Sequence, residues 1–143
     1  MSLNKLLYGV AIIAGLTATS ASAQTITNNE ARLSLAGNYI GVHLSVLGTA
    51  MRCNYNLERA YSPRTAVDEL KAFMRPDELR VLEDFLDSDD LLQSRRQVES
   101  NLDQEFQALQ SQQGLDKMTA CQVLIQNVLA NYQLTERSLE GLR

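Results

Sequence analysis

The sequence has no tryptophan, one histidine and two cysteines among its 143 residues. A single histidine leaves a zinc site short of ligands, and neither the His-Glu-x-x-His of metalloproteases nor the Gly-x-Ser-x-Gly of hydrolases occurs. Without tryptophan, a sugar-cleaving cleft would depend on five tyrosines for its aromatic surfaces. The cysteines are not spaced as Cys-x-x-Cys, the usual arrangement of catalytic redox pairs. We therefore expect no enzyme activity, no catalytic residue, no metal and no cofactor.

Positive charge is also scarce. The chain carries 13 lysines and arginines against 17 aspartates and glutamates, a formal net charge of −4. Binding to nucleic acid requires clustered basic side chains that neutralise phosphates, and a polybasic membrane patch has the same requirement. The composition therefore argues against nucleic acid and membrane surfaces as partners, and it leaves a protein partner open.

The first 23 residues have the pattern of a cleaved signal peptide. Lys5 supplies the positive start, residues 6–16 are apolar and uncharged, and the Ala-Ser-Ala of residues 21–23 is a small-x-small cleavage site. A membrane-spanning helix would need about 20 apolar residues, whereas the bulky residues stop at Leu16. We expect cleavage after Ala23, export to the periplasm or the medium, and a single mature domain over residues 24–143. Loss of Lys5 changes the net charge from −4 to −5.

The two cysteines, Cys53 and Cys121, are predicted to form a disulfide bond. An even cysteine count in an exported chain indicates pairing, because disulfides persist in oxidising compartments. A redox-active pair is the functional alternative. The predicted bond joins the end of the first long helix to the beginning of the last, so these two helices can lie antiparallel and side by side.

Hydrophobic periodicity and capping residues predict an all-α fold, a small bundle of four to five helices stapled by one disulfide. Asn28 or Asn29, Ser62 and Asp116 are expected to cap helices, and the tail after Leu139 is expected to fray. In the last helix, Met118 is expected to be buried. The helices are expected at Glu30 to about Asn54, Ser62 to Arg75, Pro76 to about Leu86, Asp90 to Ser111 and Asp116 to Leu139.

One face of the first helix carries small residues at helical spacing: Gly37, Gly41, Ser45 and Gly48. Glycine inside a helix costs about 1 kcal/mol relative to alanine, so repeated glycines indicate a close approach of something else. The alternatives are close packing within the bundle, a homodimer seam, and a groove for a small ligand or lipid.

The single histidine, His43, lies in the same apolar helix. A buried imidazole satisfied by a neighbour is the simple interpretation. Ligation of haem together with a methionine is the functional alternative.

Tyrosine and arginine gather after the first helix, and both are favoured at binding hot spots. The candidate partner-binding residues are Arg52, Tyr55, Arg59, Tyr61 and Arg64. The leading hypothesis is a non-enzymatic interaction module with a partner in the cell envelope, such as an adaptor, a chaperone-like binder or an inhibitor. The alternatives are a small-ligand or lipid carrier that uses the Gly37–Gly48 face, and, less favoured, a carboxylate-based hydrolase.

Overall fold

A computed structural model describes residues 28–143 of the chain, and this part contains five α-helices, one 3-10 helix and no strand. The predicted all-α bundle is confirmed. The predicted signal peptide lies outside the described residues. The elements are α2 (Asn29–Arg52), α3 (Pro63–Leu70), α4 (Pro76–Leu86), α5 (Asp89–Ser111), α6 (Lys117–Ser138) and η1 (Leu139–Leu142).

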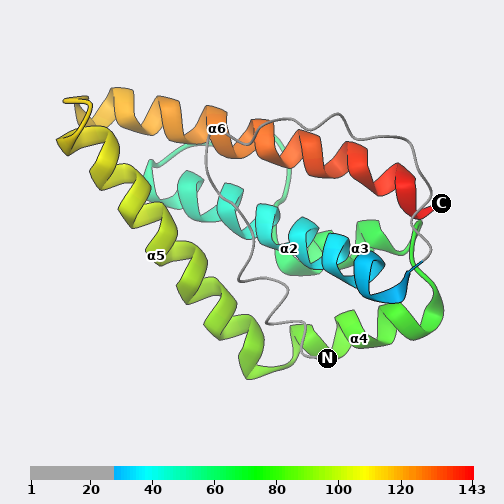
Figure 1. The fold of residues 1–143 in the computed structure, drawn as a ribbon. Coiled ribbons are helices and arrows are strands. Elements are labelled where there is room, and N and C mark those ends of the chain that lie inside the picture. Colours follow the sequence, from blue (N-terminus) through cyan, green and yellow to red (C-terminus); the bar gives the residue numbers. More distant parts are fainter. Residues whose placement is uncertain (1–27) are drawn as a thin grey trace.

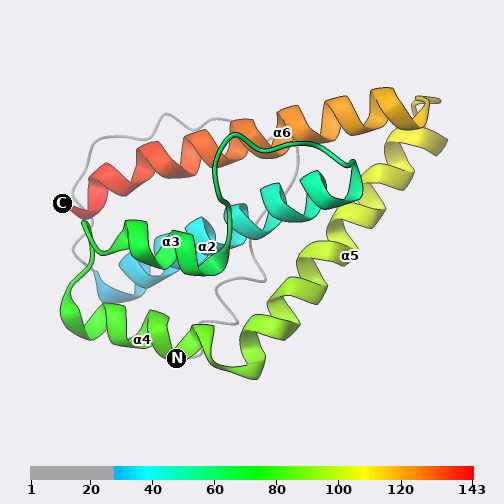
Figure 2. The ribbon, with the colours of Figure 1, turned by 180° about the vertical axis from the view of Figure 1, so that it is seen from behind.

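Helix α2 is the centre of the bundle. It contacts α3, α5, α6 and η1, and it is apolar in most directions because it is covered on most sides. Helix α6 runs antiparallel along one side of α2, α3 packs on an adjacent face that lies behind α2 in Figure 1 and in front of it in Figure 2, and α5 crosses the end of α2 obliquely. Helix α4 lies on the side of α2 away from α6. The disulfide between Cys53 and Cys121 joins the end of α2 to the first turns of α6, as predicted.

Three helices begin at the capping residues that the sequence predicts. The Asn28 side chain accepts the backbone N–H groups of Glu30 and Ala31, and Ser62 and Asp116 each accept an N–H of the following first turn. These bonds satisfy donors that have no partner within the helix. Pro63 and Pro76 stand at the first helical positions, where the missing N–H costs nothing.

Most predicted helix bounds agree with the structure to within two residues, and two expectations are wrong. The second helix was expected to reach Arg75, but α3 ends at Leu70, and the chain continues through turns to Pro76. The C-terminal tail was expected to fray, yet η1 is ordered, and Leu139 and Leu142 are buried. Two leucines three positions apart share one face of this short helix, and their burial against α2 and α6 holds it in place.

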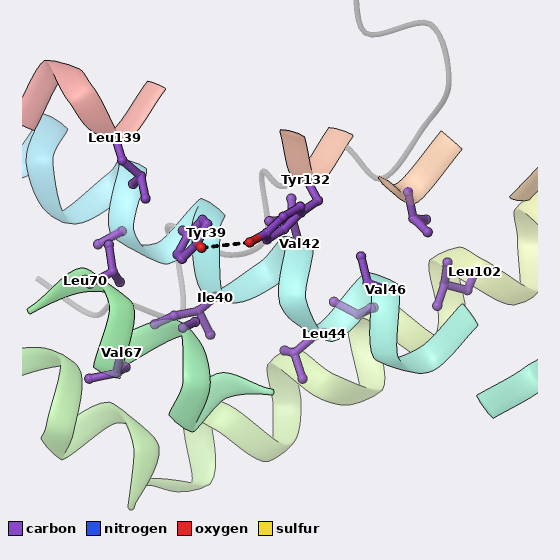
Figure 3. Packing of buried hydrophobic residues seen from close by; sticks show 14 of the residues in the cluster. Tyr39, Ile40, Val42, Leu44, Val46, Val67, Leu70, Leu102, Tyr132 and Leu139 are labelled. Atoms are coloured by element: carbon purple, nitrogen blue, oxygen red, sulfur yellow. Dashed lines mark hydrogen bonds between the residues drawn. The ribbon is translucent and has the colours of Figure 1, made fainter. Parts of the chain in front are cut away.

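The core lies between α2, α3 and α6 and extends to α5. Figure 3 shows side chains of α2 that meet Val67 and Leu70 of α3, Leu102 of α5, and Tyr132 and Leu139 at the far end of the chain. Among the described residues, no helix is both long and apolar enough to cross a membrane.

Candidate functional site

The disulfide bond lies at the C-terminal end of α2. Helix α2 ends at Arg52, and Asn54 adopts a left-handed conformation (φ 50°) that turns the chain away. The first turn of α6, which precedes Cys121, therefore extends beyond the end of α2. Met118 was expected to be buried, but it is 73% exposed for this reason.

This end contains an apolar groove of about 590 Å³, which we call the disulfide groove. Cys53 and Cys121 lie in its wall, and Met118 and Tyr55 line it from α6 and from the segment after α2. Both cysteines are partly exposed, and Tyr55 is 47% exposed. The groove is therefore an open hollow on the surface, and the covalent bond forms part of its lining.

The charged side chains that line the disulfide groove are both basic, Arg52 and Lys117. Arg52 pairs with Asp103 of α5. Lys117 has no ion-pair partner among residues 28–143. The nearest acid in sequence, Asp116, accepts the N–H of Thr119, and this hydrogen bond holds the pKa of Asp116 below its usual range. The lining of the groove thus contains two basic side chains and no acidic one, although the carboxylate of Asp103 pairs with Arg52 and that of Asp116 precedes Lys117 in the sequence.

The predicted partner-binding residues do not form one surface. Arg52 and Tyr55 line the disulfide groove. Arg64 forms an exposed ion pair with Glu83 of α4 at 2.8 Å. Arg59 and Tyr61 instead contact side chains of the bundle. Arg59 donates to side chains of α3 and α6, and the ring of Tyr61 packs against rings of α2 and α6.

These side chains form a cluster around the buried His43, which we call the tyrosine cluster: Tyr39, Tyr61, Tyr132, His43, Arg59 and Glu69. Tyr39, His43 and Tyr132 are buried, whereas Arg59 stands at the exposed edge. Arg59 donates to the Tyr132 hydroxyl at 2.8 Å and to a carboxylate oxygen of Glu69, and it lies over the rings of Tyr61 and Tyr132. The Tyr39 and Tyr132 hydroxyls are 3.1 Å apart (Figure 3). These contacts anchor the segment between α2 and α3, which also provides one side of the disulfide groove.

His43 is fully buried within the tyrosine cluster. Its Nδ1 accepts the backbone N–H of Ser62 at 3.2 Å, so the neutral ring carries its proton on Nε2. Nε2 lies 3.4 Å from Glu69 Oε1 but forms no hydrogen bond. Burial, and then the charge of Arg59, lower the pKa of His43 to about 4. His43 is therefore neutral at pH 7, and the approach to Glu69 is not an ion pair.

Acidification is expected to destabilise the protein through His43. Between about pH 6.5 and 4 the unfolded chain binds a proton that the folded chain does not, so stability falls as the pH is lowered through this range. The pKa difference corresponds to about 3 kcal/mol. Urea unfolding at pH 7 and at pH 4 measures this loss of stability. The His43→Asn variant keeps an acceptor for the Ser62 amide and does not titrate, so its stability should fall less. Equal losses in both proteins would contradict this role of His43.

The opposite end of the bundle contains a buried ion pair that the sequence pattern did not reveal. Arg32 donates to both carboxylate oxygens of Glu78, at 2.9 and 3.1 Å, and also to the carbonyl oxygens of Phe73 and Leu142. Burial alone would raise the pKa of Glu78. The hydrogen bonds from Arg32 and from the Arg75 backbone amide lower it instead. This pair joins α2, α4, the segment between α3 and α4, and the C-terminus.

The small-residue face of α2 is covered over most of its length. Gly37, Gly41 and Ser45 are buried, and Ser45 donates to the Gly41 carbonyl. At Gly48, an added Cβ would lie 2.9 Å from Leu102 Cδ1 of α5. This contact favours the close-packing interpretation at Gly48.

The chain was compared with known proteins. No family model matches it, and neither the curated proteins nor the solved structures contain a significant match. The geometry of the molecule is therefore the basis for a functional proposal.

Proposed function

We propose that this chain is an exported, non-enzymatic binding protein that docks a partner protein of the cell envelope in the disulfide groove. The observation that carries the proposal is the open apolar hollow with Tyr55 and Met118 at its edge. Folded proteins bury large apolar side chains where they can, so apolar side chains clustered around a hollow indicate an interaction surface. Tyrosine and methionine suit this use, because one is a frequent hot-spot residue and the other adapts its shape.

The proposed compartment is the periplasm or the medium. Two observations support it: the signal-peptide pattern of residues 1–23, and the bond between Cys53 and Cys121. A disulfide that links the two main helices is retained where no thiol reductant is abundant. The partner is accordingly sought in the same compartment.

The test compares capture by two matched variants of the oxidised protein. Met118→Asp removes an apolar side chain from the disulfide groove, and an acid in the first turn of a helix is well tolerated. Leu92→Asp makes the same kind of change at another exposed apolar residue, 48% exposed, in the first turn of α5 and outside the lining of the disulfide groove.

We expect native envelope extract to yield one stoichiometric partner with the wild-type protein and with Leu92→Asp, and none with Met118→Asp. Equal capture by all three proteins, or no capture by any, would overturn the proposal.

A further inference from the structure

The disulfide groove differs in charge from the rest of the molecule. The whole chain has a formal net charge of −4, yet no aspartate or glutamate lines this groove, and both charged lining residues are basic. At the edge of an apolar site, a basic side chain without an ion-pair partner, as Lys117 is among residues 28–143, favours a binding partner of opposite charge, because like charges brought together repel each other.

The two basic groups are available to different degrees. Lys117 stands at the first position of α6 without an ion-pair partner among the described residues. Arg52 is engaged by Asp103, but both of these side chains remain partly exposed. A ligand carboxylate can therefore pair with Lys117 directly, and Arg52 adds positive potential on the other side of the groove.

The shape of the groove favours a segment of a protein over a free acyl chain. A carrier of a small amphiphile encloses most of its ligand. Here Met118 remains 73% exposed and Tyr55 47% exposed, so the hollow is open along one side. An open hollow of about 590 Å³ accommodates apolar side chains that project from a docked segment.

We infer that the disulfide groove recognises an acidic, apolar segment of its partner protein, in which an apolar side chain lies over Cys53–Cys121 and a neighbouring carboxylate pairs with Lys117. This inference rests on the proposed function and adds the chemistry of the partner. The recognition is salt-dependent, because the charges act at a solvent-exposed edge.

Two blocked synthetic peptides test the inference: Glu-Leu-Phe-Leu-Glu and Lys-Leu-Phe-Leu-Lys. Methionine methyl groups report the contact in ¹³C-labelled protein, since Met118 lines the groove whereas Met74 is buried in the core away from it. We expect the acidic peptide to shift the Met118 signal with an affinity about tenfold higher than the basic peptide, and to leave Met74 unchanged.

Charge-reversal variants separate recognition from nonspecific attraction. Lys117→Glu is expected to abolish the preference for the acidic peptide. Lys71→Glu changes the net charge equally at an exposed residue of α3's C-terminus and should retain the preference.

The peptide and capture experiments distinguish failure of this inference from failure of the proposed function. A preference for the basic peptide, no preference, or no shift of Met118 with either peptide overturns this inference, even if capture of a partner still depends on Met118. Binding of dodecanoate in place of the acidic peptide also overturns it, and assigns the groove to a fatty acyl ligand. Loss of the dependence of capture on Met118 overturns the proposed function itself.

Discussion

Replacing Arg32 by methionine is expected to lower the free energy of unfolding by about 3–5 kcal/mol. Methionine keeps much of the side-chain length but removes every donor. The carboxylate of Glu78, with only 2% of its side chain exposed, would then be buried without its counter-charge. The carbonyl oxygens of Phe73 and Leu142 would lose their donor as well. Removing one member of a buried ion pair costs more than the pair contributes, because the remaining charge stays desolvated.

The matched control is Arg64→Met, the same substitution in an exposed ion pair with Glu83. Exposed ion pairs contribute little to stability, because water screens both charges, so this variant should remain close to the wild type. Urea unfolding of the oxidised proteins at pH 7, followed by circular dichroism, gives both values. If Arg32→Met lost no more stability than Arg64→Met, the buried pair would not have the role assigned to it.

The second large effect is expected from the disulfide. Replacing Cys53 and Cys121 together by alanine opens a loop with a sequence separation of 68 residues. The chain-entropy model assigns such a loop about 4 kcal/mol, because the uncrosslinked unfolded chain gains conformational freedom. The helices are expected to remain, since α2 and α6 pack along their length and the tyrosine cluster anchors the segment that follows α2.

Unfolding of the double variant, and of the wild type reduced with a phosphine, measures this effect. The two should agree within about 1 kcal/mol, since both lack the same crosslink. Because the bond also lines the groove, capture of the partner should weaken in both. A double variant as stable as the oxidised wild type would mean that helix packing alone fixes the position of α6.

The helices and the disulfide could be predicted from the sequence because each depends on local or pairwise chemistry. Asn28, Ser62 and Asp116 supply oxygen atoms for unpaired N–H groups, and this chemistry is the same in any fold. The two cysteines had only each other as partners. Their places on the two longest apolar helices were enough to predict the antiparallel arrangement.

The arrangement of polar side chains could not be predicted in the same way. Arg32 and Glu78 are 46 positions apart, and only the path of α3 and α4 brings them together. An arginine within a helix that is apolar on most sides was the one local sign of a buried partner. Arg59 and Tyr61 were predicted to bind a partner, because no residue near them in the sequence indicates that Arg59 donates to Glu69 and Tyr132 or that Tyr61 packs against Tyr132.

The exposure of Met118 could not be predicted either, because it depends on where a second helix ends. Periodicity placed it on the same stripe as Cys121 and Ile125, and this stripe is correct. Burial of a stripe also requires a neighbour opposite it, and α2 ends one turn too early to provide one. The candidate site therefore arises from the offset between the ends of two antiparallel helices, because Cys53, just after the end of α2, is bonded to Cys121, one turn after the start of α6. This offset becomes visible only when both helices are placed.

In the proposed function, the disulfide groove is the surface that binds the partner protein. The most direct measurement is the dissociation constant of the captured partner for the oxidised wild type, Met118→Asp and Leu92→Asp. We predict an increase of at least about tenfold for Met118→Asp, corresponding to 1.4 kcal/mol, and no change for Leu92→Asp. Equal constants for Met118→Asp and the wild type would contradict the claim, and so would a loss of affinity confined to Leu92→Asp.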